Sequence, residues 1–224
     1  MNQERIFTEE ELEEMGTRTL DLIEHAIDLG NYEKAKELSR RMYKEYVDTQ
    51  DSYVDWVAVL LSFIGRQYGD DVLYKAFEES IGQRVLLSLD IIEKADIRQR
   101  IEFVASNLRR HCQPMDIKED EEKVVFKMKP CGTGGRQILA GKYEPPLNFL
   151  KVKKPQPMTF WKEDFPVYCC HAHFVASAPV AQGRTPPLLE IPSDKPGEEP
   201  CEIVVYKDPQ SIPLEAYAKV GVEK

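Results

Sequence analysis

The sequence lacks the features of a membrane-spanning or nucleic-acid-binding protein. No apolar run approaches the ~18 residues that a membrane helix requires, and the longest candidate, Val57–Ile64, is about half that length. The first residues are acidic and contain no apolar segment, so we expect no secretory signal. With 30 basic against 39 acidic residues the net charge is −9, which argues against binding to nucleic acid through phosphate contacts.

Cysteine is scarce, and its number is odd. Five cysteines in a chain without an export signal favour a reducing compartment, so we expect a cytoplasmic protein whose thiols are free or ligate a metal. Hydrophobic residues make up 42% and charged residues 31% of the 224 positions. This composition is typical of a soluble globular protein with a hydrophobic core.

Proline and charge divide the chain into two parts. Residues 1–121 hold 16 basic and 27 acidic residues but only one proline, Pro114, whereas the remainder holds 14 basic and 12 acidic residues and the other 14 prolines. Because proline disrupts helix interiors, we predict an α+β fold with a helical bundle over residues 1–113, a linker over 114–122 and a small proline-rich β domain over 123–224.

Helical periodicity is evident throughout the first part. Thr8 and Glu11 form a capping-box pattern before an apolar face that continues to Ile27, and Gly30 ends that helix. Further helices are predicted over 32–47, 52–68 and 70–81, with one or two more over 84–112, packed as an antiparallel bundle. The segment 52–68 is apolar almost all round and is predicted to be the most buried. In the second part we predict strands at 123–129, 149–152, 167–174 and 202–206, and a short helix at 211–220.

Thiol and imidazole groups in the second part indicate a zinc site. The candidate ligands are Cys131, Cys169, Cys170, His171, His173 and Cys201. A turn after Cys170 predicts the set Cys131, Cys170, His173 and Cys201, whereas a straight strand would place Cys169, His171 and His173 on one face. The alternatives are a buried thiol cluster without metal and a reactive thiolate paired with His171 or His173. His111, near the domain junction, is a further candidate to approach this site; the alternative is a histidine favoured by its position near a helix C-terminus.

The glycine-rich turn after Cys131 is the second candidate. The backbone amides of Gly132, Gly134 and Gly135 can cradle an anion, and Arg136 can bind a carboxylate through its forked guanidinium. The alternative is a turn that only positions Cys131.

Carboxylates at helical spacing are the third candidate. Asp48, Asp51 and Asp55 share one helix face, and we assign Asp51 and Asp55, with Arg136, as candidate catalytic residues; the alternative is a solvated face. Aromatic residues before and within the cysteine–histidine segment either wall an apolar pocket or form the core of the β domain; they are Phe149, Phe160, Trp161, Phe165, Tyr168 and Phe174.

These patterns predict a zinc-dependent cytoplasmic enzyme, of hydrolase or lyase type, that acts on a small anionic molecule. No nucleic-acid or membrane partner is expected, and the sequence leaves a homo-oligomer open. The alternative is a non-catalytic interaction or regulatory protein in which four ligands close a structural zinc site.

Overall fold

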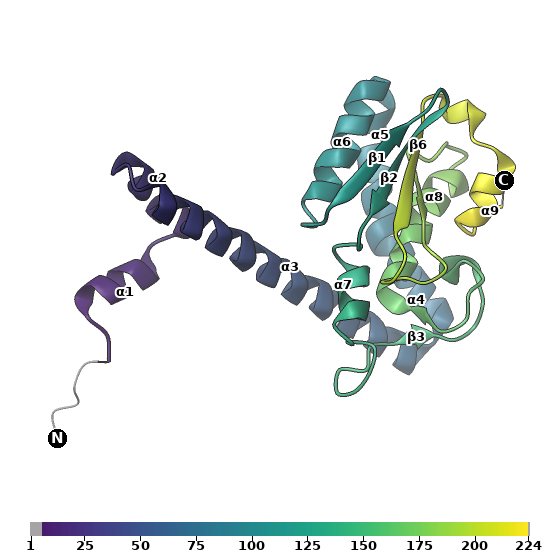
Figure 1. Cartoon of the computed structure of the whole chain (residues 1–224). Coiled ribbons are helices and arrows are strands. Elements are labelled where there is room, and N and C mark those ends of the chain that lie inside the picture. The colour runs from purple at the N-terminus through teal and green to yellow at the C-terminus, as the bar shows by residue number, and fades with distance from the viewer. Residues whose placement is uncertain (1–5, 224) are drawn as a thin grey trace. The chain divides into compact units, whose positions relative to one another are not determined.

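The computed structural model describes residues 6–223 and divides the chain into two compact units, Met1–Gln50 and Asp51–Lys224 (Figure 1). The helices are α1 (Glu9–Gly16), α2 (Thr19–Asp28), α3 (Tyr32–Tyr68), α4 (Asp70–Phe77), α5 (Gln83–Lys94), α6 (Ile97–Arg109), α7 (Gly134–Leu139), α8 (His171–Ala181) and α9 (Leu214–Lys219). The strands are β1 (Met115–Glu119), β2 (Lys123–Met128), β3 (Lys151–Val152), β4 (Phe165–Pro166), β5 (Leu189–Ile191) and β6 (Cys201–Tyr206). Over residues 6–223, every helix falls short of the length and apolar character needed to cross a bilayer.

The first unit is a small helical assembly. The predicted capping box is confirmed, since Thr8 and Glu11 exchange hydrogen bonds at the start of α1. The prediction of one helix through Ile27 is wrong, because Thr17 is extended and separates α1 from α2. Residues of α2 and the first part of α3 form a minor core; they are Ile23, Ala26, Ala35 and Leu38.

The long helix α3 replaces the two helices predicted over 32–47 and 52–68. Residues 48–52 contain neither glycine nor proline, and Lys44 pairs with Asp48 across this stretch at 2.5 Å, so nothing interrupts the helix. The prediction that 52–68 is the most buried helix is also wrong. Only one stripe, including Ala58 and Leu61, is buried, while Trp56 and Phe63 are 61% and 53% exposed.

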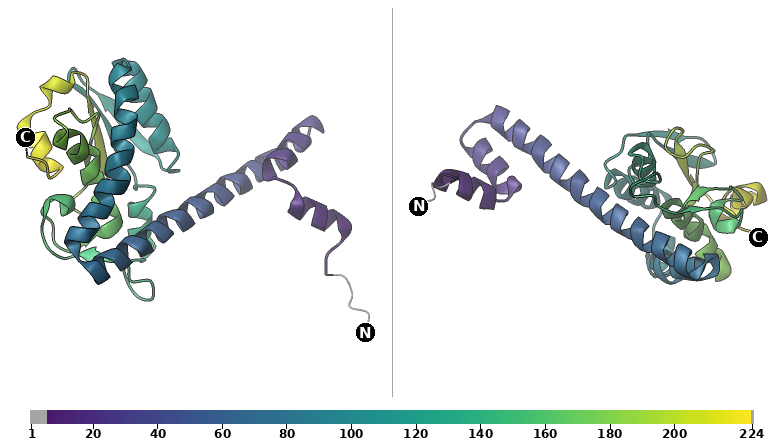
Figure 2. Two further views of the ribbon diagram at one scale, coloured as in Figure 1. Left: turned by 180° about the vertical axis from the view of Figure 1, so that it is seen from behind. Right: turned by 90° about the horizontal axis from the view of Figure 1, so that it is seen from below.

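An antiparallel sheet organises the second unit, with strand order β1-β2-β6-β5. Its two faces are covered by different helices. Ile203 and Val205 pack with Val104 and Leu108 of α6 on one side, whereas Val204 packs with α8 and α9 on the other. The views in Figures 1 and 2 agree, with α6 and α8 on opposite sides of the sheet.

The predicted linker over 114–122 contains a strand instead. β1 pairs with β2 over its full length, and Asp120 closes the connecting turn by accepting the backbone N–H groups of Glu122 and Lys123 at 2.9 Å. Pro114 therefore ends the helical series without ending a domain. Leu73 and Phe77 of α4 share a core with Phe174 of α8, so the division falls at residues 50/51 and not between 1–113 and 123–224.

Secondary structure in the second part is confirmed at some positions and corrected at one. β2, β6 and α9 match the predicted strands at 123–129 and 202–206 and the final helix. The predicted strand at 167–174 is wrong: Val167–Cys170 is a 3-10 turn that continues into α8. The alanines of His171–Ala181 favour a helix, whereas its β-branched and aromatic residues favour a strand, so tertiary packing decides between the two.

Candidate thiol and imidazole site

Three cysteines from separate segments lie near one another in the second unit. Cys131 precedes the glycine-rich turn, Cys169 lies in the 3-10 turn before α8, and Cys201 is the first residue of β6. Burial raises the pKa of the Cys169 thiol well above its usual value, and the charges of Cys131 and Cys201 raise it further. Glu190 of β5 acts on the same thiol. We call Cys131, Cys169 and Cys201 the thiol cluster.

The glycines of the turn allow close packing around this cluster. A methyl group on Gly134 would lie 2.5 Å from Sγ of Cys169, and one on Gly135 would lie 3.0 Å from Cβ of Cys131. A methyl group on Gly132 would lie 2.0 Å from the carbonyl oxygen of His111. Each glycine thus makes room for a neighbour, which favours the interpretation that the turn positions Cys131.

His171 is held in a defined orientation beside the cluster. Its Nδ1 lies 2.6 Å from the carbonyl oxygen of Tyr168, so Nδ1 donates a hydrogen bond, and in the corresponding neutral tautomer Nε2 holds a lone pair. Nε2 faces Oε1 of Glu190 at 3.8 Å. A histidine that donates one ring N–H to a carbonyl and presents the other nitrogen is suited to bind a metal or accept a proton.

Cys170 and His173 lie elsewhere. Residues two apart on a helix point ~200° apart, and His173 is accordingly buried on the other side of α8, with Nδ1 2.9 Å from the carbonyl oxygen of Val220. Cys170 is fully buried in the hydrophobic core. Neither ligand set proposed from the sequence is assembled, because both assumed a local geometry other than the observed turn and helix.

The protonation of the thiols disfavours a reactive thiolate. Burial raises the pKa of Cys201 to about 11 and that of Cys169 in the same direction. Both thiols are therefore neutral at physiological pH, whereas a nucleophilic cysteine requires a lowered pKa.

The predicted metal site is not preassembled. Within residues 6–223, no group of three or more histidine, cysteine, aspartate or glutamate side chains is arranged to hold a metal ion. The Cys131 thiol instead lies 3.3 Å from Oγ1 of Thr133. Metal binding by the thiol cluster would therefore require side chains to rotate and thiols to lose their protons.

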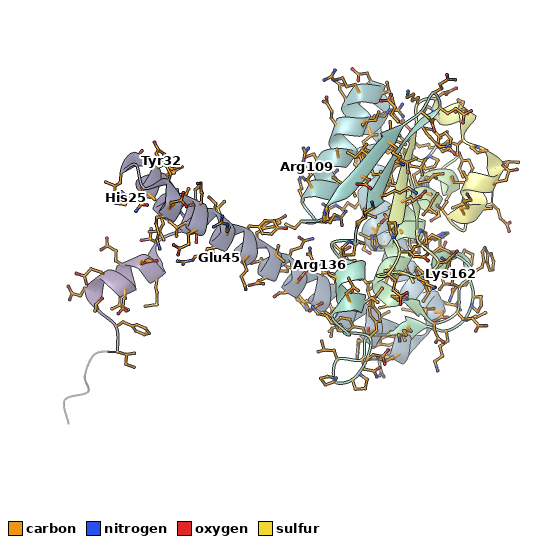
Figure 3. The ribbon with its side chains drawn as sticks, viewed as in Figure 1. His25, Tyr32, Glu45, Arg109, Arg136 and Lys162 are labelled. Carbon is orange, nitrogen blue, oxygen red and sulfur yellow. The ribbon has the colours of Figure 1, made fainter. Side chains whose placement is uncertain are left out.

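The three candidate catalytic residues are engaged in ion pairs. Arg136, labelled in Figure 3, donates from Nε and Nη2 to Oδ1 of Asp51 at 3.0 and 2.7 Å, and from Nη1 to the carbonyl oxygen of His111 at 3.0 Å. Asp55 accepts from Lys142 at 2.5 Å and from Gln137 at 3.1 Å. These contacts fasten the second half of α3 to α7, and they occupy the guanidinium that was expected to bind an anion.

Two further residues belong to the surroundings of the cluster. Burial lowers the pKa of His111 to about 4, and the nearby His171 and Arg136 act on it in the same direction. Glu190 was not predicted. A single glutamate between Leu189 and Ile191 carries no pattern that distinguishes it from a solvent-facing strand residue.

A pocket of about 420 Å³ lies in the same unit, although no residue of the thiol cluster lines it. Tyr143 lines this pocket and also lies close enough to Cys169 for that thiol to affect its pKa. Two lysines, Lys151 and Lys162, are outnumbered by four carboxylates in the lining, which are Glu144, Glu163, Asp164 and Asp194. The charge of this pocket therefore gives no support to an anionic ligand.

Comparison with known proteins identifies no family model, curated protein or solved structure that matches this chain.

Proposed function

We propose that the protein is a zinc-dependent enzyme in which Cys131, Cys169 and Cys201 bind one zinc ion. The observation that carries this proposal is the gathering of three thiols from three separate segments around Cys169, beside a histidine whose Nε2 lone pair is presented by its bond to the Tyr168 carbonyl oxygen. Three thiolates provide the protein ligands of a catalytic zinc site and leave a fourth position open.

The chain's own residues supply acid–base chemistry next to that position. Zinc, when bound, polarises a water molecule or a substrate carbonyl group. Nε2 of His171 accepts the proton that water loses, and the carboxylate of Glu190, 3.8 Å away, stabilises the resulting imidazolium. This division of roles corresponds to hydrolase or lyase chemistry. Arg136, Asp51 and Asp55 are left out of the proposed site because each is already paired within the protein.

The neighbouring pocket is the proposed place for the substrate. Its excess of carboxylates leads us to replace the anionic molecule expected from the sequence with a small neutral or cationic one. The second candidate is a structural zinc site in which Nε2 of His171 is the fourth ligand. The orientation of His171 is equally compatible with this structural site. The identity of the fourth zinc ligand therefore distinguishes the catalytic site from the structural one.

Metal content tests the proposal. We expect about one zinc per chain after expression in zinc-replete medium, loss of zinc in Cys169→Ala and retention in Cys170→Ala. The second variant is the matched control, because Cys170 is the adjacent cysteine but lies in the hydrophobic core. A folded wild-type protein without zinc, or equal zinc content in the two variants, would overturn the proposal.

A further inference from the structure

A second pocket, distinct from the thiol cluster, opens on the other side of α8. Its volume is about 580 Å³, within the range of ~300–1,000 Å³ that is typical of small-molecule sites. Tyr74, Trp161, Val180 and Val222 give it a mostly aromatic and aliphatic lining. His173 supplies its buried polar group.

The tautomer of His173 defines what the pocket can recognise. Nδ1 lies 2.9 Å from the carbonyl oxygen of Val220 and therefore donates, which makes Nε2 a hydrogen-bond acceptor. The hydroxyl of Tyr74 lies 3.4 Å from Nε2, a long contact for a hydrogen bond. Burial lowers the pKa of His173, so the ring stays neutral and keeps Nε2 as a hydrogen-bond acceptor.

The backbone on one side of the pocket is strained. Phe160 and Trp161 both adopt positive φ, at 54° and 61°, a conformation that bulky residues avoid and that is concentrated at functional sites. Phe160 is anchored in the core against Phe165, whereas the adjacent Trp161 lines the pocket and is 57% exposed. This arrangement keeps a large aromatic ring at the pocket wall that would otherwise be free to turn away.

Close packing at Gly221 completes the inner wall. Its φ is +71°, and a methyl group there would lie 2.2 Å from the carbonyl oxygen of Pro157 and 3.1 Å from Nδ1 of His173. Glycine at this position therefore allows His173 and the Pro157 turn to lie together at the pocket.

We propose that this pocket binds a small, uncharged aromatic alcohol or phenol, whose ring packs against Trp161 and whose hydroxyl donates to Nε2 of His173. The hydroxyl of Tyr74, displaced from its long contact, accepts or donates to the same oxygen. An anionic ligand is disfavoured, because the only charged residue in the described lining is Glu223.

Binding of phenol to the full-length protein tests the proposal by calorimetry. We expect saturable binding of phenol that is at least about tenfold tighter than binding of toluene, since one hydrogen bond to a buried acceptor is worth about that factor. In His173→Gln the preference for phenol over toluene should shrink at least threefold. No saturable binding of phenol, or equal binding of toluene by the wild type, would overturn the proposal.

Two variants locate the binding site. Ala181→Phe adds a ring at an exposed position that lines the pocket and should abolish phenol binding, whereas Gln182→Phe adds the same ring at the next exposed position, outside the lining, and should leave it unchanged. In a Trp56→Phe background, Trp161 is the only tryptophan of the chain, and its fluorescence should change with the same saturation curve. Phenol binding that is unaffected by Ala181→Phe would contradict the assigned location.

Discussion

The α-carbon of Gly134 lies directly against the thiol of Cys169, so that a methyl group there would stand 2.5 Å from Sγ. This contact joins the first turn of α7 to the turn before α8, and it fixes Cys169 relative to the segment that carries Cys131. The proposed zinc ligands thus depend on a residue that provides no ligand itself.

We predict that Gly134→Ala destabilises the protein by about 1–3 kcal/mol, as overpacking of a core commonly does, and lowers its zinc content. The control is Gly82→Ala, where the new methyl group makes an ordinary contact of 3.4 Å with Ala178. Urea unfolding measures the stability of both variants, and elemental analysis measures their zinc content. The double variant Gly134→Ala/Cys169→Ala should regain most of the lost stability without regaining zinc; additive losses would show that the contact is not the cause.

Arg136 is expected to act in stability and not in ligand binding. Its ion pair with Asp51 is partly exposed, with side chains 22% and 32% accessible, so Arg136→Ala should cost about 1–3 kcal/mol, between surface and buried pairs. The added effect of Asp51→Asn in that background should be small. The measurement is a double-mutant cycle by urea unfolding. A coupling energy near zero would show that the ion pair with Asp51 does not cause the loss of stability in Arg136→Ala.

His111 should make the zinc-free protein less stable in acid. Its pKa is lowered to about 4 by burial, whereas an unfolded histidine has a pKa of ~6.5. The unfolded state therefore binds the proton first, and stability falls as the pH decreases from about 6.5 to about 4, by roughly 2–3 kcal/mol. Unfolding in the presence of a chelator at several pH values should show this slope in the wild type and a flatter one in His111→Gln; equal slopes would contradict it.

Chelation should destabilise a zinc-loaded sample. The proposed zinc would bind the folded chain, whose ligands are dispersed when it unfolds, so the metal would contribute to the free energy of folding. A strong chelator should therefore lower the melting temperature of the wild type by several degrees and leave Cys169→Ala unchanged. An equal shift in both proteins would indicate an effect of the chelator that is unrelated to the thiol cluster.

The sequence predicts secondary structure correctly where interactions between residues close in the chain determine it. The capping box at Thr8, the strand ending at Met128 and the final helix all follow from local patterns. The cysteine-bearing segment was misread because 167–174 contains residues suited to both strand and helix, and tertiary packing decides between them. That error had consequences for the site, since a helix turns His171 and His173 to opposite sides.

Ion pairs between residues far apart in the chain could not be predicted from the sequence. The pairs Arg136–Asp51 and Lys142–Asp55 join residues separated by 85 and 87 positions, and no periodicity reports such a distance. The carboxylates at 51 and 55 were correctly placed on one face, but what that face meets is determined by the fold of the second unit. The sequence therefore contains no indication that Arg136 and Lys142 pair with these carboxylates.

X-ray absorption at the zinc edge tests the central claim most directly. The account predicts three sulfur ligands at ~2.3 Å and one nitrogen or oxygen ligand at ~2.0–2.1 Å, with the same spectrum in His171→Ala if the fourth position belongs to water or substrate. A spectrum that loses its light ligand or its zinc in His171→Ala would favour the structural site. A zinc shell of nitrogen and oxygen alone, without sulfur, would contradict the assignment of the thiol cluster.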